Sequence, residues 1–179
     1  MKKFISVLVL VITALSVSAQ VKPLTFSEVI QADGKSQAQI FGGLREWVAT
    51  TFVSGKTVTQ MEDPTTGTII LKAEFPFKKG GIYSAYEGHV SYMLKLQAKD
   101  GRFRVEMSNI SHENKPGNAQ HCSLGLITTA EKSGKGGLDK GSHNKIWKEV
   151  KEKAQEQFNL LVSSLKSASL DGSSTEEDW

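Results

Sequence analysis

The sequence predicts a two-layer α+β domain, in which two helices cover one face of an antiparallel sheet of about five strands. Two segments repeat apolar residues at steps of three and four positions, as amphipathic helices do. Between them, apolar and polar residues alternate, which is typical of strands with one buried face. The expected order along the chain is therefore strand, helix, four strands, helix.

The first strand and first helix are predicted within residues 24–52. A short β-rich run over residues 24–31 ends at the turn dipeptide Asp33-Gly34. Ser36 and Gln39 then form the sequence pattern of a capping box. The apolar face of the helix comprises Ile40, Phe41, Leu44, Trp47, Val48 and Phe52. We expect this face to pack against another apolar surface.

The four following strands are expected between residues 58 and 107. Val58 and Met61 begin the first, which ends at the turn cluster of residues 63–67. Lys99-Asp100-Gly101 should form the turn of a hairpin between the last two strands. The expected buried sides of the last three strands consist of Ile69, Leu71, Ala73 and Phe75, of Val90, Tyr92, Leu94 and Leu96, and of Phe103, Val105 and Met107. Their opposite sides are largely polar.

The remaining chain divides into a loop, a helix and a tail. Regular patterning is lost over about residues 111–141, which we expect to form a long loop that is functional, partly disordered or contains a short strand. The second helix should run over about residues 142–168. Its apolar stripe consists of Ile146, Val150, Ala154, Phe158, Leu161 and Leu165. The polar, acidic residues 169–179 are expected to be disordered.

Residues 1–19 have the pattern of a secretory signal peptide. Lys2 and Lys3 precede an apolar segment over residues 4–15, and small residues end at Ala19. The apolar segment is shorter than the roughly 20 residues that span a bilayer. We expect cleavage after Ala19, a periplasmic or secreted protein, and no membrane span after cleavage. Because Cys122 is the only cysteine, lipid attachment at a new N-terminal cysteine is excluded.

Cleavage would leave 160 residues, enough for one domain over residues 20–168. The net charge of +3 includes Lys2 and Lys3, so the mature chain carries about +1. This small charge does not favour nucleic acid as a partner. A single cysteine cannot form an internal disulfide, and Cys122 is expected to be buried.

Several stretches resemble one family of secreted proteins common in the Bacteroidota. They are the strand at residues 26–30 with the turn at 33–36, the helix at 44–52, the strand start at 67–70 and the hairpin at 90–104. That family is a domain of unknown function with a fold like the TATA-binding protein (TBP-like). The resemblance implies fold and export, and it brings no catalytic residues and no cofactor.

A catalytic or metal site has one set of candidates, His112, His121 and Cys122, in the expected loop. Zinc favours such ligands, but their spacing fits no recognised metal pattern. His112 and Glu113 could begin an HExxH motif, but the second histidine of that motif is missing. No Gly-x-Ser-x-Gly motif is present either. A periplasmic enzyme or metal protein built on these three residues is therefore kept as the alternative.

The uncovered face of the expected sheet is the other candidate site. Its cationic side chains are Lys72, Lys95, Arg102 and Arg104, interspersed with Glu74 and Glu106. Proteins that read the minor groove through such a face need basic groups and apolar wedges, and this mixed pattern does not favour DNA. The leading hypothesis is an exported, non-catalytic binding domain for an unknown protein or small ligand.

Overall fold

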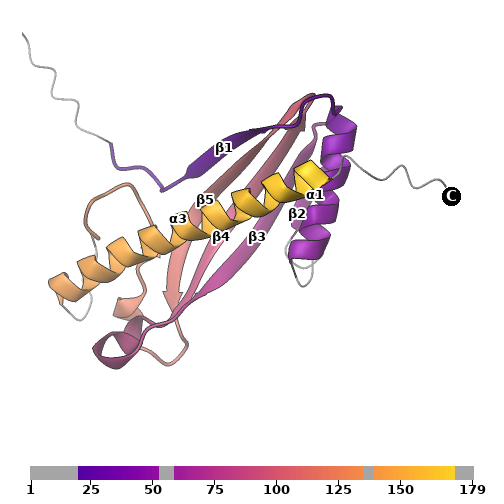
Figure 1. Ribbon diagram of the computed structural model, residues 1–179. Helices are drawn as coiled ribbons and strands as arrows, with labels where there is room; N and C mark the ends of the chain where they lie inside the picture. Colours follow the sequence, from indigo (N-terminus) through magenta and orange to yellow (C-terminus); the bar gives the residue numbers. More distant parts are fainter. Residues whose placement is uncertain (1–19, 53–58, 135–138, 172–179) are drawn as a thin grey trace, which may run out of the picture.

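A computed structural model describes residues 20–52, 59–134 and 139–171. In it, a curved antiparallel sheet carries both long helices on one side (Figure 1). The elements in chain order are β1 (Phe26–Gln31), α1 (Gln37–Thr51), β2 (Thr59–Asp63), β3 (Thr68–Phe77), the 3₁₀ turn η1 (Gly81–Tyr86), β4 (Gly88–Lys99), β5 (Arg102–Asn114), η2 (Gln120–Cys122), β6 (Gly125–Leu126) and α3 (Lys140–Asp171). The predicted α+β architecture is confirmed.

Helix α1 begins with the predicted capping box. The Gln39 backbone N–H donates to Ser36 Oγ at 3.3 Å, and the Ser36 backbone N–H donates to Gln39 Oε1 at 2.9 Å. Five of its six expected apolar side chains are buried, and Phe52 packs edge-on against Trp47. Trp47 Nε1 also donates to Ser164 Oγ at 2.9 Å, which joins α1 to α3.

Helix α3 begins slightly earlier than predicted, because Asp139 caps it. The carboxylate of Asp139 accepts from the Ser142 N–H at 2.8 Å, and its carbonyl accepts from the His143 N–H at 3.0 Å. All six residues of the predicted apolar stripe are buried. The helix continues to Asp171, three residues past its expected end.

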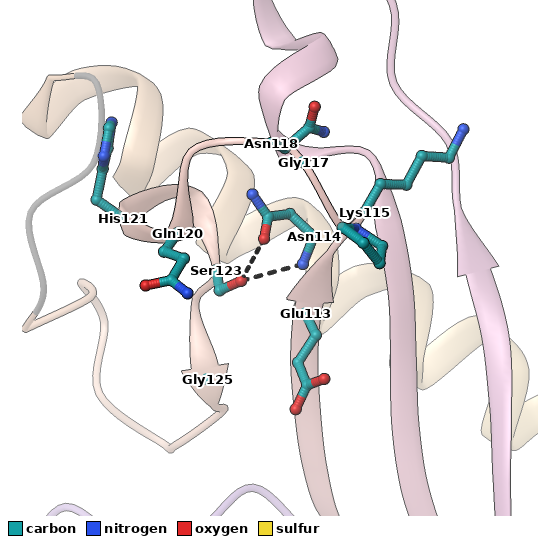
Figure 2. A pocket seen from close by; sticks show the side chains of 10 residues that line it. Glu113, Asn114, Lys115, Gly117, Asn118, Gln120, His121, Ser123 and Gly125 are labelled. Atoms are coloured by element: carbon teal, nitrogen blue, oxygen red, sulfur yellow. Dashed lines mark hydrogen bonds between the residues drawn. The ribbon is translucent and has the colours of Figure 1, made fainter.

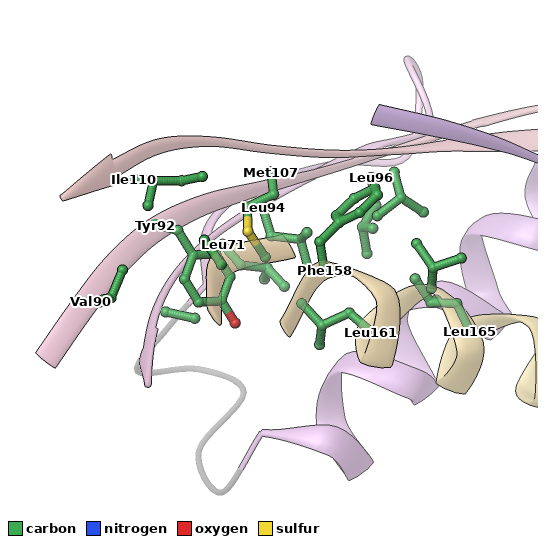
Figure 3. Close-up of a cluster of buried hydrophobic side chains, with 14 of the residues drawn as sticks. Leu71, Val90, Tyr92, Leu94, Leu96, Met107, Ile110, Phe158, Leu161 and Leu165 are labelled. Atoms are coloured by element: carbon green, nitrogen blue, oxygen red, sulfur yellow. The ribbon is translucent and has the colours of Figure 1, made fainter. Parts of the chain in front are cut away.

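The sheet has the strand order β1-β5-β4-β3-β2, and β6 pairs with β5 beyond the end of β1. The β4–β5 hairpin turns at Asp100-Gly101, with Lys99 opposite Arg102, as predicted. Figure 3 shows the apolar side chains of β3, β4 and β5 facing Phe158, Leu161 and Leu165 of α3. The core therefore lies in one layer between sheet and helices.

A bulge at Asn109 reverses which side chains of β5 face the core. Asn109 has a φ of 51°, and the pairing with β4 shifts by one residue between Met93 and Ser91. Before the bulge, Met107 faces the core, whereas after it Ile110 and His112 do. Simple alternation could not predict this reversal.

The expected loop boundary at residue 111 is wrong, because β5 continues through Asn114. The rest of the region is also ordered in part, by η2 and by the two-residue strand β6. Ladder hydrogen bonds from the Ile127 N–H to the Ile110 carbonyl (2.8 Å) and from the Leu24 N–H to the Ile127 carbonyl (2.9 Å) extend the sheet here. The predicted signal peptide (1–19) and most of the predicted disordered tail (172–179) lie outside the described residues.

Candidate functional site

The side of the sheet opposite α1 and α3, here called the uncovered face, carries the four predicted cationic residues. Strand register places Arg104 between Val29 of β1 and Gln97 of β4, and Arg102 between Gln31 and Lys99. Directly paired residues share a face of the sheet. Arg102 and Arg104 therefore lie next to each other, together with Lys99, which sequence reasoning had assigned only to the turn.

Lys72 and Lys95 lie elsewhere on this face, nearer the middle of the sheet. Lys72 pairs with Met93, and Lys95 lies between Ile70 and Glu106. The structure therefore brings together only two of the four predicted cations. The middle of the face is mixed in charge and includes Ile70 and Met93 as partly exposed apolar contacts.

The charges at the two ends of the uncovered face have opposite signs. The basic end, at the β4–β5 turn, consists of Lys99, Arg102 and Arg104. The acidic end consists of Glu74 and Glu113, and His89 lies between these two carboxylates. The Nε2 atom of His89 lies 3.8 Å from Glu74 Oε2 and 3.7 Å from Glu113 Oε2. This separation arises from register, since the two ends lie at opposite ends of β4 and β5.

A hollow of about 300 Å³ lies at the basic end. Its lining comprises Val29, Gln97, Lys99, Arg102, Phe103 and Arg104. All of its charged members are cations, and Val29 is 47% exposed beside Arg104. Such a site suits a ligand that carries an apolar group next to an anionic group.

His112, one of the predicted metal or catalytic candidates, is fully buried in the core. Its Nδ1 accepts a hydrogen bond from the Leu124 N–H at 3.2 Å, so its Nε2 carries the proton and donates to the Tyr86 carbonyl at 3.0 Å. Burial lowers the pKa of His112 from 6.5 to about 4, which keeps the ring neutral. Both ring nitrogens therefore form hydrogen bonds that stabilise the fold.

The other two candidates do not join His112 in a site. His121 is exposed and lines an open hollow, whereas Cys122 is buried in η2. Among residues 20–52, 59–134 and 139–171, no three His, Cys, Asp or Glu side chains are grouped so that they could hold a metal ion.

The hollow beside His121 measures about 750 Å³, and most of the residues that line it are of polar types (Figure 2). Asn114 fixes its wall, since its Oδ1 accepts from Ser123 Oγ at 2.6 Å and its Nδ2 donates to the Ala119 carbonyl at 2.8 Å. Asn118 donates to the Ser84 carbonyl of η1 at 3.3 Å. These amides are engaged within the protein, so they hold the loop in place. Sequence reasoning did not anticipate this hollow, because no periodic pattern marks it.

Comparison with known proteins identifies the domain. Residues 26–113 match the family described as a domain of unknown function (DUF4468) with TBP-like fold. Residues 26–113 of the chain therefore belong to the DUF4468 family. The matched stretch runs from the start of β1 nearly to the end of β5, so it contains the whole basic end. The resemblance noted from the sequence is confirmed.

Two solved structures are similar to this chain. A TBP-like protein from Parabacteroides distasonis is similar over 80% of this chain and 93% of its own, with 14% identity and a TM-score of 0.54. A DUF4468 family protein from Bacteroides ovatus covers 80% of this chain and 86% of its own, with 19% identity and a TM-score of 0.49. No curated protein matches the sequence. At such identities the first likeness establishes the TBP-like fold of this DUF4468 protein and nothing about its partner.

The described helices of the DUF4468 protein do not meet the requirements for crossing a membrane. Within the described residues, none is both long enough and apolar enough to do so. The long helix α3 instead has a charged outer side and a buried apolar stripe.

Proposed function

We propose that this protein is an exported, non-catalytic binding domain that holds its partner on the uncovered face of the sheet. The observation that carries the proposal is the separation of charge on that face, with three cations at one end and two carboxylates at the other. A sheet face that only contacts water does not require its opposite charges to be separated, because polar residues in any arrangement keep such a face hydrated. A partner with a complementary field would be oriented by it.

The basic end has unused binding capacity. In the described part of the chain, Lys99, Arg102 and Arg104 form no ion pair with a carboxylate, whereas Arg45, Lys115 and Lys166 elsewhere do. Arginine guanidinium groups bind planar anions such as carboxylates through paired hydrogen bonds. The preferred partner class is therefore a protein or small ligand with acidic groups.

The alternative, an enzyme or metal protein using His112, His121 and Cys122, has less support. It depends on His112, whose two ring nitrogens are engaged with the backbone of Tyr86 and Leu124. Ligation by either nitrogen would break a buried hydrogen bond, which costs about 1–3 kcal/mol. The binding role requires no such rearrangement.

Export is proposed from the leader pattern of residues 1–19. Lys2 and Lys3 belong to this leader pattern, so its removal would leave the mature chain with a net charge of about +1. Nucleic acid is not the proposed partner, because Glu74, Glu106 and Glu113 share the face with the cations.

The test is affinity capture by the immobilised mature chain, residues 20–179, from its native compartment. The face variant is Lys95→Ala with Arg102→Ala and Arg104→Ala. The control variant also removes three positive charges, but from the exposed side of α3, at Lys140, Lys148 and Lys153. We expect an identified partner to be retained by the wild type and the control and lost by the face variant. A partner retained equally by all three proteins would contradict the proposal.

A further inference from the structure

Strand β1, which lines the basic hollow through Val29, is an edge of the sheet. It pairs with β5 on one side, and the described part of the chain supplies no strand to its other side. Figure 1 shows β1 along the outer margin of the sheet. An edge strand presents backbone N–H and C=O groups with which another strand can pair. The outer side of β1 is therefore a template for one further strand.

Alternate residues of β1 direct their backbone groups to this open edge. Just before β1, the Leu24 N–H donates to the Ile127 carbonyl at 2.9 Å. Just after β1, the Ala32 N–H donates to the Gly101 carbonyl at 2.9 Å. The direction of the N–H and C=O groups alternates along a strand, so the even-numbered residues use theirs within the sheet. The residues whose groups point away from β5 are Ser27, Val29 and Gln31.

The other edge strand, β2, is less suited to further pairing. A bulge interrupts its pairing with β3 between Thr59 and Met61, and such bulges are one of the devices that protect sheet edges. The six residues of β1 pair with β5 in unbroken register, and none of them is proline. Of the two edges, β1 is thus the one that can accept a regular strand.

We propose that the acidic partner of this protein binds as an extended peptide, which adds to the outer side of β1 and carries carboxylates at alternate positions. Its main chain pairs with the outward N–H and C=O groups of β1, as in other cases of strand addition. Alternate side chains of the peptide then lie on the uncovered face, next to Val29. Strand addition rests on the proposed binding role of that face and names the class of its partner.

The spacing of the two arginines matches such a peptide. Arg102 and Arg104 are exposed and lie opposite Gln31 and Val29 of β1, on the same face. Two residues of strand span about 6.6–6.8 Å, which is also the spacing of alternate side chains in an added strand. That strand would lie about 9.4–9.8 Å from β5, with β1 between them. Across the short side chain of Val29, each arginine can therefore approach one carboxylate.

A second copy of this chain fits the same edge less well. The residues of β1 on the uncovered face are Ser27, Val29 and Gln31, and none of them carries a charge. If two copies paired through β1, this strand would offer no carboxylate on that face to Arg102 or Arg104 of the other copy. Charge complementarity therefore favours an acidic peptide as the added strand.

The test uses the mature chain, residues 20–179, and a short synthetic peptide of alternating glutamate and threonine with blocked ends. Amide hydrogen exchange is measured by NMR with and without the peptide. We expect the outward amides of Ser27, Val29 and Gln31 to exchange fast in the free protein and to become protected in the complex. The amides of Glu28 and Ile30 should be protected in both. Outward amides that the peptide leaves unprotected would overturn strand addition.

A backbone-modified peptide separates strand addition from attraction by charge alone. It has the same side chains, but the amide nitrogens that face β1 are methylated, so they cannot donate hydrogen bonds. We expect it to bind about tenfold more weakly than the unmodified peptide. Equal affinity of the two peptides would mean that the carboxylates bind without strand pairing, and the proposal would be wrong.

Variants of the protein test the same two contributions. Arg102→Gln/Arg104→Gln should weaken binding of the unmodified peptide by about tenfold or more, whereas Lys148→Gln/Lys153→Gln on α3 should not change it. Val29→Pro removes an outward N–H, which an edge strand tolerates, and should also weaken binding. If that variant does not fold, the methylated peptide decides. Edge amides that become protected at high protein concentration without peptide would overturn the proposal, because they indicate pairing of two copies.

These outcomes are separable from those of the proposed function. Unprotected β1 amides together with loss of the captured partner in the face variant would reject strand addition and keep the binding role. A peptide that adds to β1, together with a captured partner that all three proteins retain equally, would support strand addition and reject the proposed role of the face for that partner.

Discussion

The backbone N–H of Leu124 donates a hydrogen bond of 3.2 Å to Nδ1 of His112, across twelve residues of sequence. This bond joins the end of β5 to the chain entering β6. It also defines the tautomer of His112, whose Nε2–H then donates to the Tyr86 carbonyl. One buried ring thus ties three separate segments together, and this explains a histidine that looked like a ligand in the sequence.

Replacing His112 with Leu should destabilise the fold by about 2–4 kcal/mol, because it removes the buried hydrogen bonds from the Leu124 N–H to the ring and from the ring to the Tyr86 carbonyl. The measurement is the urea midpoint at neutral pH. His121→Ala, at an exposed position, should change stability by less than about 0.5 kcal/mol. Equal effects of the two substitutions would show that His112 has no structural role.

Stability should fall on acidification, because burial holds the pKa of His112 at about 4 instead of 6.5. Above pH 6.5 the ring is neutral in both states, so it adds no pH dependence. As the pH falls from 6.5 to about 4, the unfolded chain binds a proton that the folded chain does not. The expected loss is about 3 kcal/mol, the full shift converted to free energy.

Urea unfolding at about pH 7.5 and about pH 4.5 measures this loss. The His112→Leu protein serves as the reference, since it retains every other titrating group, including Asp63 and Asp139. We expect a smaller pH dependence in the variant than in the wild type. Identical slopes would mean that a different group controls the acid sensitivity.

Asn109 should tolerate glycine but not valine. Its φ of 51° lies in the left-handed region, which Asn and Gly adopt readily and β-branched residues do not. We expect Asn109→Val to cost about 1–2 kcal/mol and Asn109→Gly to be close to neutral. Thermal or urea unfolding checks the difference, and a valine variant as stable as the glycine variant would argue against a required bulge.

The mature protein should begin at Gln20. Small residues at Val17, Ser18 and Ala19 precede that position, as signal peptidase requires. N-terminal sequencing of the protein from its native host measures this directly, and an Ala19→Leu substitution should block processing. An intact Met1 in the exported wild-type protein would disprove cleavage.

Much of the fold could be predicted from local pattern. The capping box of Ser36 and Gln39, the Asp100-Gly101 turn and the stripe from Ile146 to Leu165 depend on neighbours within a few residues, and all three are confirmed. The site was less predictable. Lys99 was treated as a turn residue, and only its pairing with Arg102 shows that it belongs to the basic end.

By itself the sequence determined which residues form helices and strands, which side of each strand is apolar, and that one face of the sheet is left uncovered. Periodicity suffices for this, since burial selects one stripe of a helix and alternate residues of a strand. Only the tertiary structure decided the role of His112, the continuation of β5 to Asn114 and the opposite charges at the two ends of the face. Each depends on a bulge or on strand register, which place distant residues side by side.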